Sequence, residues 1–224
     1  MSTSINTNNY SLNAQTNLAK NSLGLRSALE RLSSGLRVNS ARDDATGLAS
    51  GMKIDAAARV TAVDIRKEGD KISSAQITDG ALSVVGDIVA RIMELTAMGG
   101  GSAEIGLLVT QASDVQTAAN TAIAKFGGTS TALVAVTSAA DETVLGNVSA
   151  ARTTAGSIMN NAEFAIQSKR VSYEAQQAAR SRIMDADFAQ ETSNLSRFQI
   201  LQQAGTAMVA QANAIPQNVL TLLR

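Results

Sequence analysis

The chain has 224 residues with 19 basic and 19 acidic side chains, so its formal net charge is zero. That balance offers neither a basic surface for nucleic acid nor a polybasic clamp for a membrane. Cysteine and histidine are both absent, which excludes disulfides and thiolate metal sites and removes the commonest general base. We therefore expect a protein that is not an enzyme, with no catalytic residues, no cofactor and no metal.

The composition favours helices. Alanine is abundant, proline occurs once, and aromatic residues make up 3% of the chain. Alanine is the best helix former and proline the worst, and few aromatics indicate narrow seams between helices. No apolar run approaches the length of a membrane span, and residues 1–9 lack the pattern of a cleavable secretory signal. The expected fold is mainly α, a long antiparallel helical bundle or coiled coil with one small β-hairpin.

The first predicted helix covers residues 9–34. Its leucines recur every seven residues, and further residues fill the alternate positions: Leu18, Leu25 and Leu32, with Ser22, Leu29 and Leu36. This 4-3 spacing is typical of a coiled-coil seam. A surface helix on a globular body is the alternative, but the strict heptad favours packing along another helix.

A polar connector follows at residues 35–47, bracketed by two glycines and containing the pair Asp43 and Asp44. An aspartate here would cap the next helix and favour its positive N-terminal end. Paired carboxylates also serve acid–base or metal chemistry, but no histidine and no second acidic cluster accompanies them. Capping or ion pairing is therefore the favoured interpretation.

The next predicted helices cover residues 45–98 and 102–124, with glycines 99–101 ending the first. An apolar face marks the longer helix: Ile72, Ala75, Leu82, Val85, Val89, Ile92 and Leu95. Residues 132–137 are rich in valine and threonine and are entered through Gly127 and Gly128. This pattern predicts a small hairpin near 126–137.

Two further seams occupy the C-terminal half. A helix capped by Asp141 would carry the first at 4-3 spacing: Val144, Val148, Ala151, Ala155, Ile158, Ala162 and Ala165. From Ile183 onward a second heptad system begins: Phe198, Leu201, Gly205, Met208, Ala212, Ile215, Val219 and Leu222. We expect this last seam to pair with the helix at 9–34 and other subunits to cover the remainder.

Motifs at both ends of the chain resemble bacterial flagellin. Residues 5–8 (INTN) and 28–47 (ALERLSSGLRVNSARDDATG) are similar to its N-terminal signature. Residues 181–189 (SRIMDADFA), 199–205 (QILQQAG) and the ending 210–224 are similar to its C-terminal signature. The resemblance covers roughly residues 1–100 and 145–224 and implies a short member without outer variable domains. It implies an inner terminal domain from residues 1–42 and 184–224, and a helical core domain at 43–183 containing the hairpin.

The resemblance implies a structural subunit of the flagellar filament, exported unfolded and self-assembling as a helical homopolymer to give motility. Its implied location is secreted, in the extracellular filament. The implied partners are the flagellar export apparatus, an export chaperone, the filament cap and hook-junction proteins, without nucleic acid or membrane insertion. A hook–filament junction protein and a generic coiled-coil adaptor are the alternatives. The C-terminal motif favours flagellin over both.

The resemblance also implies roles for individual residues. The inner helices would assemble through eight apolar residues: Leu18, Leu25, Leu29, Leu32, Leu201, Met208, Ile215 and Val219. Polar contacts at the connector would come from Arg31, Arg37, Asp43 and Asp44. A vertebrate Toll-like receptor would recognise a patch formed by Arg91 and Leu95, although the flanking residues differ from the family pattern.

Overall fold

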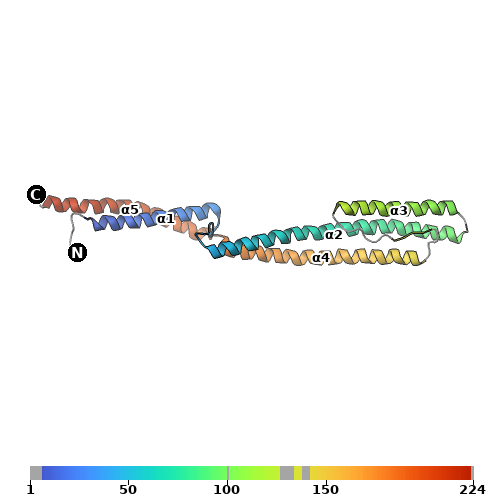
Figure 1. The fold of residues 1–224 in the computed structure, drawn as a ribbon. Coiled ribbons are helices and arrows are strands. Elements are labelled where there is room, and N and C mark those ends of the chain that lie inside the picture. The colour runs from blue at the N-terminus through green and yellow to red at the C-terminus, as the bar shows by residue number, and fades with distance from the viewer. Residues whose placement is uncertain (1–6, 100, 127–133, 138–141, 223–224) are drawn as a thin grey trace. The chain divides into compact units, whose positions relative to one another are not determined.

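A computed structural model describes residues 7–99, 101–126, 134–137 and 142–222, with side chains described as far as Ala214. These residues confirm the mainly α fold (Figure 1). Five helices are described: α1 (Asn9–Ser34), α2 (Ala45–Ala97), α3 (Ser102–Lys125), α4 (Glu142–Met184) and α5 (Phe188–Leu222). The first three begin where the sequence predicts and end within one residue of the prediction.

Part of the predicted hairpin near 126–137 lies outside the described residues. The predicted cap Asp141 also lies outside them. Residues 134–137 are described and form no strand, so for them the prediction is wrong. Val134 and Val136 pack against the helical core, and the Gln116 side-chain amide donates a hydrogen bond to the Val134 carbonyl at 2.9 Å. The Val134 carbonyl therefore accepts its hydrogen bond from a glutamine side chain and not from a neighbouring strand.

The chain divides into two compact units. Residues 1–55 and 177–224 form the first, here called the terminal unit, and residues 56–176 form the second, here called the bundle unit. The domain limits predicted at 42–43 and 183–184 both fall inside the terminal unit. The division into inner and core domains stays a prediction.

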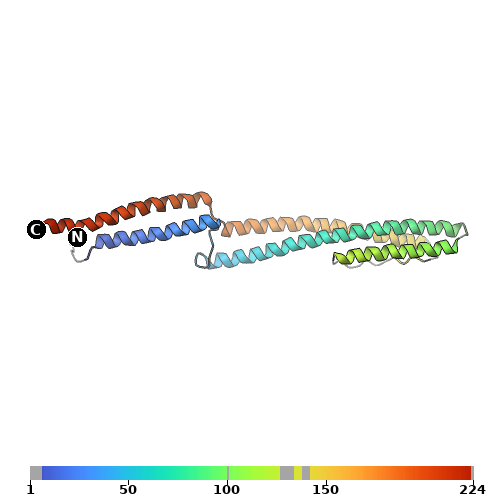
Figure 2. The same ribbon diagram turned by 90° about the horizontal axis from the view of Figure 1, so that it is seen from above.

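The terminal unit is built on α1 and α5, which run side by side in both views (Figures 1 and 2). Asn8 caps α1 by accepting a hydrogen bond from the Ser11 backbone amide. Gly35 ends α1 with a φ of 70°, a left-handed conformation that glycine adopts without strain. These end signals explain why the sequence predicts the bounds of α1 so well.

The bundle unit contains the larger hydrophobic core, formed where α2, α3 and α4 pack together. Its largest fully buried side chains are Val85, Val89, Ile92 and Ile123. The apolar face predicted for α2 is buried from Ala75 to Leu95, with Ile72 half-buried. Three positions of the predicted α4 seam are also buried: Val148, Ala155 and Ala162.

Candidate assembly surface

The contact between α1 and α5 is a narrow seam of small side chains. Its buried members are Ser11, Ala28, Glu191 and Ala212. The Leu18 side chain lies over Gly205, and the Phe198 ring lies over Gly24. Because glycine has no side chain, the two helices approach closely at both places. Residue numbers rise on α1 as they fall on α5 along these contacts, so the helices are antiparallel as predicted.

Polar contacts hold both ends of this seam. At one end the Ser11 hydroxyl donates to Asn213 Oδ1 at 2.7 Å, and Asn8 Nδ2 donates to the Ala212 carbonyl at 2.8 Å. At the other end Arg31 Nη1 pairs with Glu191 Oε1 at 3.1 Å. Arg31, predicted as a connector contact, therefore makes its ion pair within the subunit, to a carboxylate whose side chain is 10% exposed.

The position of Leu29 differs from the sequence expectation. Its side chain is 47% exposed, whereas its neighbour Ala28 is buried at 3%. The other predicted leucines of α1, Leu18, Leu25 and Leu32, are half-buried. Close approach of the helices leaves room for alanine but not for leucine at this level of the seam. Leu29 consequently lies outside the contact between α1 and α5.

An open groove runs along one side of this helix pair, with a volume of about 600 Å³. On α1 its lining includes Tyr10 and Leu18, and on α5 it includes Leu201, Ala204 and Met208. Tyr10 is 53% exposed and Met208 is 62% exposed. The structure thus brings two of the predicted assembly residues of α5, Leu201 and Met208, to one groove. The side chains of Ile215 and Val219 lie outside the described residues.

A row of asparagines forms the polar edge of the groove on α1: Asn9, Asn13, Asn17 and Asn21. They follow one another at intervals of four residues, which places them along one face of the helix. Asn17 Nδ2 donates to Asn13 Oδ1 at 2.8 Å. The groove therefore combines apolar surface with amide groups able to donate and accept hydrogen bonds.

The two connectors of the terminal unit are joined by backbone hydrogen bonds. Leu36 and Asp185 form an antiparallel bridge, and the backbone amide of Ala186 donates to the Gly35 carbonyl at 2.9 Å. The predicted residue Arg37 donates from Nη2 to the Ile183 carbonyl at 2.9 Å. Sequence reasoning missed Met184, which is 8% exposed and whose carbonyl accepts from two backbone amides of the other connector.

The aspartate pair serves the local backbone. Asp44 Oδ1 accepts from the Gly47 amide at 2.8 Å, which confirms that an aspartate caps α2. Asp43 Oδ2 accepts from the Ser40 hydroxyl at 2.9 Å and from the backbone amides of Ser40 and Asn39. The hydroxyl bond, followed by the amide bonds, lowers the pKa of Asp43 below its usual value. Both carboxylates act as acceptors for the chain around them.

The predicted receptor patch does not form a continuous surface. Arg91 is exposed and pairs with Glu94 at 3.0 Å and Glu104 at 3.7 Å. Leu95 is only 6% exposed and belongs to the hydrophobic core. The structure therefore offers Arg91, already paired with two carboxylates, and leaves the Leu95 side chain inside.

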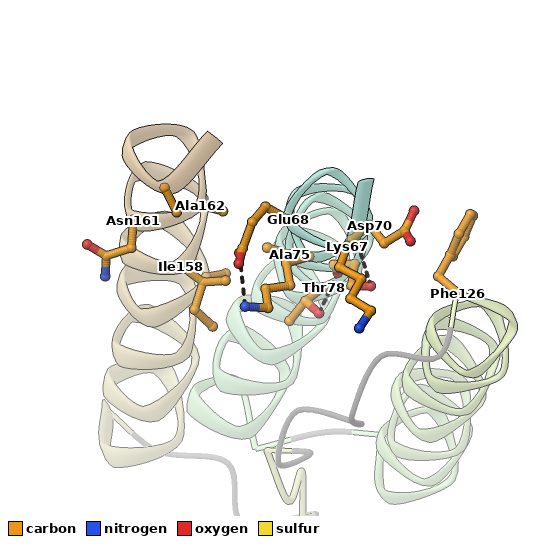
Figure 3. A pocket seen from close by; sticks show the side chains of 13 residues that line it. Lys67, Glu68, Asp70, Ala75, Thr78, Phe126, Ile158, Asn161 and Ala162 are labelled. Carbon is orange, nitrogen blue, oxygen red and sulfur yellow. Dashed lines mark hydrogen bonds and ion pairs between the residues drawn. The ribbon is translucent and has the colours of Figure 1, made fainter. Parts of the chain in front are cut away.

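The bundle unit has a second groove, of about 890 Å³, between α2 and α4 beside Phe126 (Figure 3). Alanines line its apolar part, and Lys71 pairs with Glu68 across its edge at 2.9 Å. Its hydroxyls, on Ser74 and Thr78, donate to carbonyls of their own helix.

Within the part of the chain that the structure describes, no group of three or more acidic side chains is placed to hold a metal ion. No described helix combines the length and apolarity needed to cross a membrane.

Comparisons with known proteins agree at both ends of the chain. A family model described as the bacterial flagellin N-terminal helical region matches residues 5–104, and one described as the C-terminal helical region matches residues 138–223. A flagellin of Xenorhabdus nematophila is 32% identical, with all of both chains covered. The flagellar filament 33 kDa core protein of Treponema phagedenis is 28% identical, and a flagellin of Bacillus subtilis is 29% identical. Each of these two alignments covers 98% of this chain and 99% of the relative.

Proposed function

The chain belongs to the bacterial flagellin family and is a structural subunit of the flagellar filament, and from this premise we propose that subunits join through the groove of the terminal unit. The groove is lined by Tyr10, Leu18, Leu201 and Met208. A second copy of this chain is the proposed occupant, because a filament subunit must present surfaces to further copies of itself.

The observation that carries this proposal is the exposure of the large apolar side chains that line the groove, Tyr10, Leu201 and Met208. Further apolar side chains are exposed elsewhere on the same helices: Leu12, Leu23 and Leu29 on α1, and Phe188 and Ile200 on α5. Burying one such side chain fully contributes about 1.5–3 kcal/mol. Leu12 and Leu23 are eleven residues apart, three helical turns, and so share a face.

Contacts that do not close on themselves produce a filament rather than a ring or a dimer. In the terminal unit, exposed apolar side chains occur on both α1 and α5, so more than one neighbouring copy can be contacted. The asparagines beside the groove would then fix the alignment of the neighbour, as polar residues do at coiled-coil seams. The predicted roles of Leu25, Leu32, Ile215 and Val219 belong to the same proposal.

The test replaces Met208 with aspartate. A buried carboxylate without a partner opposes association strongly, so we expect Met208→Asp to remove filaments seen by negative-stain microscopy after a polymerisation trigger. Met98→Asp is the matched control, since Met98 is 68% exposed and lies just beyond α2 in the bundle unit. Equal filament yield from Met208→Asp and the parent protein would exclude the groove as an assembly surface.

The route to the filament is part of the proposal. The resemblance supports export of the unfolded chain through the flagellar export apparatus, with an export chaperone, the filament cap and hook-junction proteins as partners. The absence of cysteine agrees with a chain that passes to the outside without forming disulfides. Detection of the chain outside cells that have the export apparatus, and its retention in cells without it, is the test of secretion.

The remaining residue roles are proposed in the light of the geometry. Arg37 joins the first connector to the Ile183 carbonyl, Arg31 joins α1 to α5, and Asp43 and Asp44 hold their own stretch of backbone. Recognition by a vertebrate Toll-like receptor at Arg91 and Leu95 stays a prediction, and the burial of Leu95 weighs against direct contact with that side chain. Receptor activation by Arg91→Ala, compared with the parent protein, tests the part that is exposed.

A further inference from the structure

The glycines of the helices fall into two kinds. A Cβ atom added at Gly24 would lie 2.6 Å from the Phe198 ring, and one added at Gly205 would lie 3.0 Å from Leu18 Cδ1. A Cβ atom added at Gly69, Gly80 or Gly156 would meet nothing within 4 Å. Glycine lowers helix stability wherever it occurs. At Gly24 and Gly205 this cost has a structural counterpart, because the missing side chain makes room for Phe198 and Leu18.

The two contacts are reciprocal. A side chain of α5, Phe198, sits over a glycine of α1, and a side chain of α1, Leu18, sits over a glycine of α5. Such an arrangement resists both sliding directions, because movement of one helix removes both large side chains from their glycines at once. We call Gly24–Phe198 and Gly205–Leu18 the two glycine contacts.

Other registers of the same helices lack this fit. Sliding by one heptad, the smallest shift that keeps the seam residues facing each other, would place Phe198 opposite Asn17 in one direction and Arg31 in the other. The first shift would also bring Leu18 against Phe198. Either shift would break the Ser11–Asn213 hydrogen bond at one end and the Arg31–Glu191 ion pair at the other.

The register decides whether the groove exists. Its two walls come from different helices, with Tyr10 and Leu18 on α1 and Leu201 and Met208 on α5. Gly205 belongs to both features, since it lines the groove and receives Leu18. A shift of one heptad would move one wall along the other by about 10 Å and separate these residues.

We propose that the two glycine contacts select the register of α1 against α5 and thereby determine which assembly surface a subunit presents to a second copy. Gly24, Phe198, Leu18 and Gly205 are positioning residues for assembly. The inference rests on the proposed function of the groove, but the register itself is measured independently of filament yield.

The register is measured with a disulfide. The chain contains no cysteine, so no native thiol competes with an introduced pair, and a cross-link within one chain is separated from one between chains by denaturing gel electrophoresis. Leu18 Cβ lies 3.8 Å from the position of a Cβ atom at residue 205, and disulfides have a mean Cβ–Cβ separation of about 3.8 Å. Leu18→Cys with Gly205→Cys reports the register of the structure. Leu18→Cys with Ala212→Cys reports a shift of one heptad.

We expect oxidation to cross-link the 18–205 pair within one chain, and the cross-linked protein to polymerise more readily than its reduced form, which lacks the Leu18–Gly205 contact. We expect filaments of the 18–212 variant to remain without an intramolecular cross-link. Cross-linking of residues 18 and 212 within one chain in filaments would overturn the proposal. So would cross-linked 18–205 protein that fails to polymerise while its reduced form succeeds.

A second pair of variants tests whether the glycines are required. Gly24→Ala overpacks the contact, and we expect the association constant to fall about tenfold. Adding Phe198→Leu removes ring atoms from the clash, so Gly24→Ala with Phe198→Leu should recover assembly. Normal assembly by Gly24→Ala alone would overturn the glycine contacts as register determinants while leaving the groove in place. Normal assembly by Met208→Asp would instead exclude the groove, whatever the disulfides show.

Discussion

The terminal unit and the bundle unit use helices of similar composition in opposite ways. In the bundle unit four large side chains are almost completely buried, Val85, Val89, Ile92 and Ile123. In the terminal unit the buried residues of α1 are Ser11 and Ala28, while Leu12, Leu23 and Leu29 of the same helix are exposed. The bundle unit therefore packs a core of large side chains within one chain, although others such as Leu107 and Phe164 stay exposed. The described part of the α1–α5 pair buries only small or polar side chains.

The difference lies in the number of helices that share a seam. A third helix, α3, covers α2 and α4 along part of their length and completes a core. The pair α1 and α5 has no described third helix, so each can bury only the narrow strip that faces the other. We therefore expect folding of the terminal unit to be coupled to association, since binding stabilises the state that binds.

The largest expected effect comes from removing half of the α1–α5 pair. Deleting residues 202–224 removes Met208, Gly205 and Ala212, and we expect complete loss of filaments because one wall of the groove is gone. The bundle unit should keep its helicity and melting temperature, measured by circular dichroism. Filaments of normal appearance from the truncated chain would contradict the division between the two units.

The reverse experiment damages the core of the bundle unit. Ile92→Ala removes buried atoms from a fully enclosed site, and we expect the free energy of unfolding to fall by about 2–5 kcal/mol. Leu23→Ala is the control, since Leu23 is 59% exposed in the terminal unit. Chemical denaturation of the free subunit should separate the two variants. Equal destabilisation would mean that both units depend on burial within the chain.

A smaller effect distinguishes the glycines of the two units. Gly80 lies in α2 with no atom within 4 Å of an added Cβ, so Gly80→Ala should stabilise the free subunit by about 0.5–1 kcal/mol. Gly24→Ala should give no such gain, because its Cβ meets the Phe198 ring. Thermal melting of both variants provides the measurement. A loss of stability in Gly80→Ala would show that this glycine is packed.

The smallest effect concerns the charges of the bundle unit. Hydrogen bonding to Lys71, with the charges of Lys71 and Lys169, lowers the pKa of Glu68 below 4.5. A carboxyl group whose pKa is lower in the folded state than in the unfolded state stabilises the folded state at a pH above the unfolded-state pKa. This stabilisation is lost as the pH falls through the folded-state pKa. Glu68→Gln should cost less than about 1 kcal/mol near neutral pH. Melting temperatures of the variant and parent should converge in acid, and a constant difference would contradict this assignment.

Local signals explain how much of the fold could be predicted. Gly35 ends α1 and Gly99 follows the end of α2, and both have the positive φ angle that stops a helix. The unbroken 4-3 pattern of α4 likewise predicts its seam, and Val148, Ala155 and Ala162 are buried there. In these places the local sequence determines the helix end or the buried face, and the identity of a distant partner is not needed to predict it.

Where the structure differs from a simple pattern in the sequence, the difference depends on which partner a residue meets. Hydrophobicity alone assigns Leu29 to the seam, but close approach at Gly24 and Gly205 favours Ala28. The spacing of Arg91 and Leu95 places them on adjacent turns, yet α3 packs close enough to bury Leu95. Valine and threonine at 134–137 suggest a strand, whereas in the structure the Gln116 side-chain amide donates a hydrogen bond to the Val134 carbonyl. The sequence shows the periodicity of a helix or strand more readily than it shows which neighbouring element each residue will contact.

Hydrogen exchange of the free subunit and of the filament tests the central claim most directly. We expect amides of α1 and α5 to exchange rapidly in the free subunit, while buried parts of α2, α3 and α4 exchange slowly. In the filament α1 and α5 should become protected, and the bundle unit should change little. Strong protection of α1 and α5 already in the free subunit would contradict the claim that the terminal unit gains its stability on assembly.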